Sequence, residues 1–208
     1  MAISNYSELK SSIGDWLNRS DLTSVIPTFI ALAEAQMERV LRTRQMIVRA
    51  NATIDTKYGA VPGDFLEVKS FKLTSTTPPQ PLQFVTVDEM DGLDALNTAT
   101  GRPKYFSVVG GQFRVHPSPD ASYTGELIYF AQLSKLSDSN TTNWLLTDAP
   151  DVYLYGSLIQ AAPYLQDDAR LNVWSTLYAS GIQAVQVSDD RAATSGGTLK
   201  VRAKPFGA

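Results

Sequence analysis

Few residues of this 208-residue chain belong to the types that commonly perform catalysis. The chain has no cysteine, which excludes disulfides, thiolate zinc sites and cysteine nucleophiles. With a single histidine, His116, it can hardly form a serine triad or a two-histidine zinc site. His116 ends a predicted strand just before Pro117. We therefore expect it to be a partly exposed sheet residue rather than a general base.

Carboxylates are the remaining candidates for acid–base chemistry. The densest group, Asp88-Glu89-Met90-Asp91, opens a predicted short helix and lacks the alternating order of a calcium loop. The adjacent acids in Asp167-Asp168 and in Asp189-Asp190 would point about 100° apart on a helix. A glycosidase needs two carboxyl groups facing each other at roughly 5–10 Å, which folding could still assemble. Candidates for such a pair are Glu89, Asp91, Asp167 and Asp168.

Sequence motifs for nucleotide binding, serine hydrolysis or zinc proteolysis do not occur in the chain. It contains no G-x-G-x-x-G, G-x-x-x-x-G-K-[ST], G-x-S-x-G or H-E-x-x-H. We therefore expect a protein that is not an enzyme, with no catalytic residue, no metal and no cofactor.

Basic residues crowd the end of the most regular helical pattern in the chain. They are Arg39, Arg42, Arg44 and Arg49. Cations in the last turn complement the helix dipole and can form a solvated face. The same residues could instead form a basic contact patch for a partner or for nucleic acid.

The C-terminal segment, residues 194–208, differs from the rest of the chain in charge. The chain has a net charge of −3, and this segment carries +3, which leaves −6 on the remainder. Ser195-Gly196-Gly197 predicts a flexible joint. Apolar and basic residues then mix in Leu199, Lys200, Val201, Arg202, Lys204 and Phe206. The segment is either a disordered, solubilising end or an arm that becomes ordered when it binds a neighbouring subunit or an acidic partner.

Helical periodicity is clearest between Val25 and Arg44, with Pro27 in the first turn and Thr23 or Ser24 as the expected cap. A preceding helix is expected to be capped by Asn5 or Ser4, and the short loop between the two helices predicts an αα-hairpin with Trp16 between them. Two more helices are expected after Asp148, one through Leu165 and one from Leu171 to about Arg191. The apolar stripes predict buried positions for Trp16, Phe29, Met37 and Trp174.

Strand patterns occupy the middle of the chain. Residues 46–54 alternate apolar and polar side chains, and 65–73 read as a short helical turn running into a strand. Residues 105–109 and 112–116 flank Gly110-Gly111, which predicts a tight hairpin. Residues 127–133 are expected to add a third strand to that hairpin as a meander.

These elements predict an α+β fold in which the N- and C-terminal helix pairs form one bundle. We expect a single domain over residues 1–193, with helices in 1–44 and 148–193, a β-rich insertion over 45–147, and a flexible basic arm over 194–208. The sequence shows neither a membrane-spanning run nor a signal peptide, so we expect a soluble protein made in a cytoplasm.

Several stretches resemble the head-to-tail adaptor proteins of tailed, chiefly short-tailed, bacteriophages, which are also called gatekeepers or connectors. The similarity begins with S-x-Y-x-E-L from Ser4, W-L-N-R-x-D-L from Trp16 and I-P-x-F-I-x-L-A-E-A-x-x-x-R from Ile26. It continues with V-P-G-D-F-L-E-V from Val61, G-R-P-K-Y-F-S-V from Gly101 and the helix containing Tyr153, Tyr155, Gly156, Ala161 and Ala162. The resemblance covers residues 4–190 and leaves the last fifteen residues unmatched.

The resemblance implies a ring of twelve copies beneath the dodecameric portal, forming part of the DNA exit channel. Its implied partners are the portal protein, a tail nozzle or tube protein, further copies of itself and packaged DNA in the lumen, with no membrane. Its implied place is the virion neck, after assembly in the host cytoplasm. The alternative from another class is a virion-associated cell-wall hydrolase using the carboxylates named above. A DNA-binding module is a third possibility, which the net charge of −3 disfavours.

Overall fold

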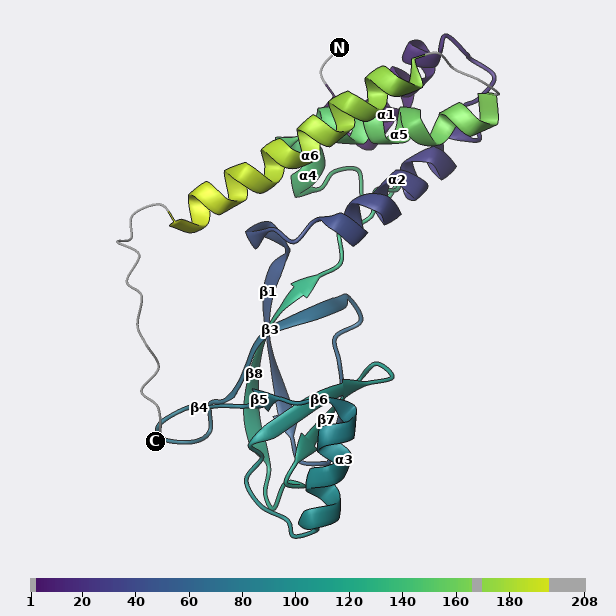
Figure 1. Ribbon diagram of the computed structural model, residues 1–208. Coiled ribbons are helices and arrows are strands. Elements are labelled where there is room, and N and C mark those ends of the chain that lie inside the picture. Colours follow the sequence, from purple (N-terminus) through teal and green to yellow (C-terminus); the bar gives the residue numbers. More distant parts are fainter. Residues whose placement is uncertain (1–2, 166–169, 195–208) are drawn as a thin grey trace. The chain divides into compact units, whose positions relative to one another are not determined.

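The computed structural model describes residues 3–165 and 170–194 and combines helices with largely antiparallel sheets (Figure 1). The chain divides into two compact units. The helical unit comprises the chain up to Gln45 and from Leu133 onward, and the sheet unit is Met46–Gln132. Residues 133–147, assigned from sequence to the β-rich insertion, lie in the helical unit. The predicted arm lies outside the described residues, apart from the end of the last helix.

The helical unit contains α1 (Tyr6–Leu17), α2 (Ile26–Val40), α4 (Trp144–Asp148), α5 (Pro150–Leu165) and α6 (Leu171–Thr194), and the 3₁₀ helix η1 (Arg44–Met46) crosses into the sheet unit. Asn5 caps α1 as expected, since its side chain accepts from the Glu8 amide at 3.0 Å. The expected cap of α2 is wrong: Val25 occupies that position without a side-chain bond, because the Thr23 hydroxyl donates to the Ser20 carbonyl instead. None of the described helices is both long and apolar enough to cross a bilayer.

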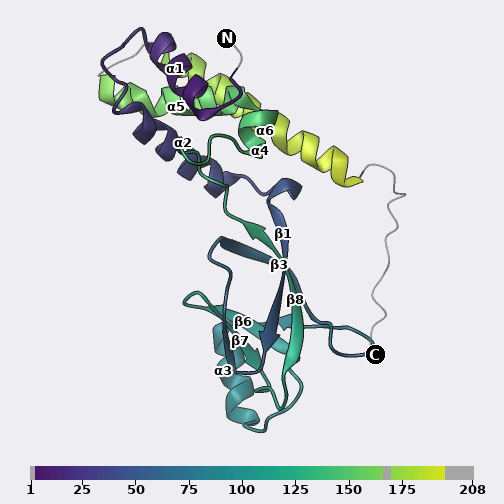
Figure 2. The same cartoon turned by 180° about the vertical axis from the view of Figure 1, so that it is seen from behind.

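Helix α5 is the centre of the helical unit, because it contacts α1, α2, α4 and α6. α6 lies alongside it in both views (Figure 1 and Figure 2). At Gly156 an added Cβ would lie 2.9 Å from Met37 Cε on α2 and 3.0 Å from the Tyr178 ring on α6. Both values are below normal contact distance, so the absent side chain permits the close approach of three helices. The predicted α1–α2 contact exists, but α2 packs more extensively on α5.

Three of the four predicted core residues, Phe29, Met37 and Trp174, are buried in the helical unit. The expectation for Trp16 is wrong, since its side chain is 45% exposed. The buried stripe of α1 follows Leu9, Ile13 and Leu17 at four-residue steps, which leaves Trp16 at its margin. There its ring meets the edge of Tyr155, with 5.8 Å between centroids.

The sheet unit holds two four-stranded sheets and one helix. In the first sheet the order is β1 (Ile47–Ile54), β8 (Tyr123–Ala131), β3 (Phe65–Leu73) and β4 (Gln80–Pro81). In the second it is β2 (Tyr58–Ala60), β7 (Gln112–His116), β6 (Tyr105–Val109) and β5 (Gln83–Phe84), and α3 (Val87–Leu96) contacts β6 and β7. Both sheets contribute to one core, in which Phe71 and Leu127 of the first meet Phe106 and Phe113 of the second.

The β6–β7 hairpin is confirmed, with positive φ angles of 56° at Gly110 and 78° at Gly111. The predicted meander is wrong, because β8 pairs with β1 and β3 in the other sheet. Residues 65–68 belong to strand β3 and not to a helical turn. Two register irregularities in β3, between 65 and 67 and between 68 and 70, interrupt the simple alternation that marks a strand in sequence.

We predict that Phe29→Ala lowers the free energy of unfolding of the helical unit by about 3–5 kcal/mol, because a buried aromatic ring leaves a cavity. Leu32→Ala, on the exposed side of α2, is the matched control and should change it by less than about 1 kcal/mol. All three tryptophans lie in this unit, so fluorescence-detected urea unfolding reports on it. Equal midpoints for the two variants would contradict the assignment of the buried stripe.

Candidate functional site

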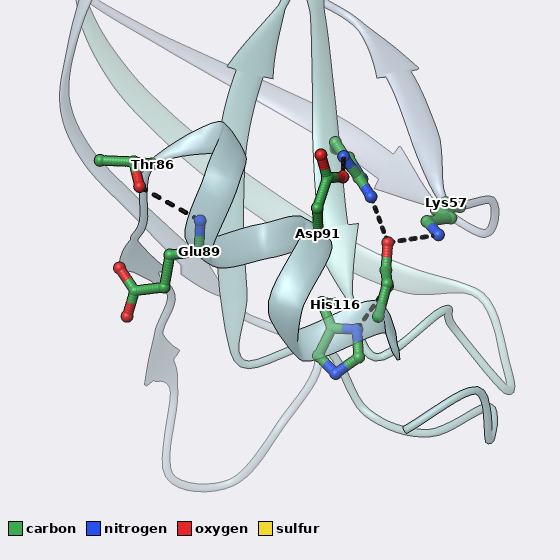
Figure 3. A network of polar contacts seen from close by, with 7 residues as sticks. Lys57, Thr86, Glu89, Asp91 and His116 are labelled. Carbon is green, nitrogen blue, oxygen red and sulfur yellow. Dashed lines mark hydrogen bonds and ion pairs between the residues drawn. The ribbon is translucent and has the colours of Figure 1, made fainter. Parts of the chain in front are cut away.

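A charged cluster in the sheet unit surrounds Asp94, in the second half of α3. Lys57, in the turn before β2, places Nζ 2.6 Å from Asp94 Oδ2. On β7, His116 Nδ1 lies 2.7 Å from Asp94 Oδ1, and Arg114 Nη2 donates to Oδ2. Arg114 also pairs through Nη1 with Asp91 at 2.5 Å. Figure 3 shows Lys57 and His116 approaching the carboxylate from different sides.

The cluster holds Asp94 in its charged form. Burial raises the pKa of the Asp94 carboxyl, but the hydrogen bonds from Lys57, Arg114 and His116 outweigh it and keep the pKa well below its usual range. The hydrogen bond to Asp94 raises the pKa of the Arg114 guanidinium. Because a carboxylate can only accept, the His116 Nδ1 carries the proton in this contact.

This arrangement corrects the expectation that His116 is partly exposed, since only 4% of it is accessible. α3 covers β7 and supplies the partner carboxylate, and a strand pattern cannot reveal such a cover. Among the described residues, the buried Ser107 Oγ has no hydrogen-bond partner, so His116 and Ser107 do not form a nucleophile–base pair. The cluster holds α3 against the second sheet through the hydrogen bonds and ion pairs of Asp94.

The carboxylates of the hydrolase alternative are not brought together in the described part of the chain. Glu89 lies in the first turn of α3, where its amide donates to Thr86 Oγ1, and Asp91 pairs with Arg114. Because they are two residues apart on one helix, their side chains point about 160° apart. Asp167 and Asp168 lie outside the described residues. Across residues 3–165 and 170–194, no group of three or more acidic or histidine side chains could hold a metal ion.

The proposed basic patch is divided between the two units. Arg39, Arg42 and Arg44 belong to the helical unit and Arg49 to the sheet unit. Arg42 Nη1 donates to the carbonyls of Glu38 and Leu41 at the end of α2.

Two of these arginines form ion pairs within their own units. Arg44 lies 3.6 Å from Asp189, and Arg49 lies 2.9 Å from Glu126. The residues of the C-terminal arm lie outside the described residues.

A buried carboxylate in the helical unit was not identified from the sequence. Glu34 on α2 is 2% exposed, and its Oε1 accepts from the Leu136 amide at 2.8 Å and from the Tyr153 hydroxyl at 3.1 Å. Asn143 Nδ2 donates to the same hydroxyl at 2.6 Å. Glu34 stands four residues after Ile30 and three before Met37, so its place on the apolar stripe was the available signal. It fixes the polar segment 134–143 to α2.

The outer face of α6 is unusual for a helix exposed to water. From Leu171 to Ser188 the helix carries no charged residue. Its exposed side presents what we name the α6 stripe: Val173, Leu177, Ser180, Ala184 and Val187. These positions recur at alternating steps of four and three, the spacing of a helix–helix seam. The helical unit also exposes the apolar side chains of Leu32 and Val40 on α2.

Comparison with known families matches the chain to the SU10 adaptor protein family over residues 4–202. The chain belongs to the SU10 adaptor protein family. This family consists of structural adaptor proteins of bacteriophages, which agrees with the coarser part of the resemblance drawn from sequence. The match also runs into the C-terminal segment that sequence inspection left unmatched. No curated protein matches the chain.

We predict that Glu34, which is buried, and Asp94, which is half-buried, change the stability of the protein with pH in opposite directions. Burial raises the pKa of the Glu34 carboxyl, and its hydrogen bonds oppose this only in part. The protonated carboxyl therefore contributes stability that is fully present below the pKa of Glu in the unfolded chain, about 4.3. That contribution is lost as the pH rises through the pKa of Glu34 in the folded protein. Glu34→Gln keeps an acceptor for Leu136 and Tyr153 without a charge, and should flatten this pH dependence. Glu34→Ala should cost about 1–3 kcal/mol by leaving both donors unpaired. Fluorescence-detected unfolding between pH 4 and 8 tests both; a stable alanine variant would contradict the role of the carboxylate.

The pKa of the Asp94 carboxyl is lower in the folded protein than in the unfolded chain, where it is about 3.9. The ionised carboxylate therefore contributes stability above that pH, and this contribution is lost as the pH falls through the pKa of the folded protein. Asp94→Asn should destabilise the sheet unit at neutral pH by roughly 1.5–3 kcal/mol, because charge-assisted hydrogen bonds are lost. Asp88 is exposed at the start of the same helix, so Asp88→Asn is the control. It should change the free energy of unfolding by only about 0.3 kcal/mol. Amide hydrogen exchange in α3 and β7 measures the difference. Equal protection in the two variants would show that the cluster does not fasten α3.

Proposed function

We propose that the chain is a head-to-tail adaptor that forms a ring beneath the portal of a tailed bacteriophage. The ring joins the portal to the tail and lines part of the DNA exit channel. The observation that carries the proposal is the family match over residues 4–202, nearly the whole chain. In this proposal the partners are the portal protein, a tail nozzle or tube protein and eleven further copies of the chain. Packaged DNA passes through the lumen.

Two features of the structure support a role in assembly. The α6 stripe and the exposed apolar residues of α2 are different surfaces, and contact between unlike surfaces of successive copies generates a ring when the rotation closes. The charged cluster at Asp94 is used internally and offers no reactive group. Within the proposal, the arm residues Leu199–Phe206 contact the portal or a neighbour, and Arg39, Arg42, Arg44 and Arg49 provide basic contacts.

Electron microscopy and sedimentation of the purified chain, with and without the portal protein of the same phage, test the function directly. We expect a ring docked coaxially on the portal. Absence of any complex at micromolar concentrations of both proteins would contradict the proposal.

Leu177→Asp should disrupt ring formation without unfolding the chain, because Leu177 is 39% exposed in the single chain and an aspartate there would place a charge within the contact. We expect at least a tenfold loss of self-association, about 1.4 kcal/mol. Gln186→Asp adds the same charge on another side of α6 and is the matched control. Unfolding curves establish that both variants are folded. Equal assembly of the two would show that the α6 stripe is not a subunit contact.

A further inference from the structure

A groove with a volume of about 540 Å³ lies in the sheet unit, between strand β3 of the first sheet and strands β5 and β6 of the second. Its walls are mainly apolar and include Phe65, Val68, Phe84, Phe106 and Val108. Phe84 is 59% exposed although it stacks edge-to-face on the buried Phe106, with 5.5 Å between ring centroids. An aromatic side chain left half-covered at the mouth of an apolar groove is an anchor position for a binding partner.

Both strands that border the groove have an edge without a strand partner along part of their length. β3 pairs with β8 on one side, while on the other side β4 pairs only with Lys72 and Leu73. β6 pairs with β7 on one side, and β5 reaches only Tyr105 and Phe106 on the other. Among residues 3–165 and 170–194, no strand therefore covers 65–70 of β3 or 107–109 of β6 at these edges. Open edges of this kind accept an added strand from another segment.

The chain itself contains a segment with the pattern of such a strand. From Leu199 to Lys204 the sequence alternates strictly, with Leu199, Val201 and Ala203 separated by three cations. In an extended conformation one side is apolar and the other basic, the pattern of a strand with one face on a core and one in water. Pro205 then ends the run, since proline cannot donate to a ladder.

Length and charge are compatible with this segment reaching another copy. Five chain steps separate Thr194 from Leu199, so Leu199 can lie up to about 17 Å from the end of α6, and the fourteen residues after Thr194 span up to about 46 Å when fully extended. The +3 charge of the segment opposes the −6 of the rest of the chain, which favours their encounter. The groove itself contains both Glu67 and Lys69, so charge does not select this edge. Main-chain hydrogen bonds and apolar contact would do so.

We propose that the segment Leu199–Lys204 of one copy adds as a strand to the open edge of β3 in the neighbouring copy, with its apolar side in the groove. The inference rests on the proposed function, because the ring supplies the neighbour. It makes the arm a link between copies rather than a portal contact. Each copy then gives one arm and receives one, which is the unlike-surface contact that a closed ring requires.

The absence of cysteine makes disulfide trapping a clean test. We introduce Val68→Cys in the groove together with Val201→Cys in the arm of the same full-length chain, and oxidise the assembled protein with diamide. We expect a ladder of covalent oligomers on non-reducing gels. Val68→Cys with Arg202→Cys is the matched control, since Arg202 faces away from the groove. It should cross-link roughly tenfold less, because cysteines whose Cβ atoms point apart cannot be bridged.

A second control places the groove cysteine on the other open edge of the first sheet. β1 pairs with β8 alone and does not line the groove, so Ala52→Cys with Val201→Cys should give no ladder. A single Val68→Cys chain establishes the background of random collision.

The outcomes separate this inference from the proposed function. Equal cross-linking through Val201 and Arg202, or a ladder through Ala52 in place of Val68, would overturn the docking of the arm on β3. A bridge formed only within one chain, seen as a faster-moving monomer, would overturn the assignment to a neighbour. Ring and portal binding are scored separately on the unmodified chain. A ring that forms normally while no trapped ladder appears rejects this inference alone.

Discussion

The close packing of α2 on α5 joins two parts of the chain that are far apart in sequence. The helical unit is assembled from residues before 46 and after 132, with the sheet unit between them. At Gly156 an added Cβ would lie 2.9 Å from Met37 of the first part and 3.0 Å from Tyr178 of the last helix, so both side chains would have to shift. Folding of the helical unit therefore depends on closing a chain segment of nearly ninety residues. The two ends of that segment are held by contacts that only the folded unit provides.

Polar groups reinforce the same junction. Glu34 on α2 receives the amide of Leu136 and the hydroxyl of Tyr153, and Glu38 receives the amide of Leu133 at 3.2 Å. A chain that returns from the sheet unit is thus bound to α2 immediately after it re-enters the helical unit. Buried carboxylates are costly unless they are hydrogen-bonded, so these bonds specify one path for the segment rather than adding much net stability.

The sheet unit uses its charges differently. Asp94 on α3 binds Lys57, Arg114 and His116 through hydrogen bonds and ion pairs. The single histidine of the chain therefore has a structural role. Two surfaces expose apolar side chains: the α6 stripe in the helical unit and the groove beside β3 in the sheet unit. Exposed apolar side chains of this kind are typical of surfaces that contact other chains. This property agrees with membership of a family of structural adaptor proteins.

The sequence by itself determined most of the local structure. Four of the long helices, the strand β1 and the Gly110-Gly111 hairpin follow from periodicity and turn chemistry, which depend on neighbouring residues only. The motifs shared with the adaptor family along residues 4–190 predicted that the protein is a bacteriophage adaptor. Tertiary structure alone decided that β8 lies between β1 and β3, because strand partners are chosen by segments distant in the chain. It likewise decided that His116 is buried, because α3 packs over β7, and that Trp16 is exposed, because the elements packed on α1 cover the stripe of Leu9, Ile13 and Leu17, at whose margin it lies.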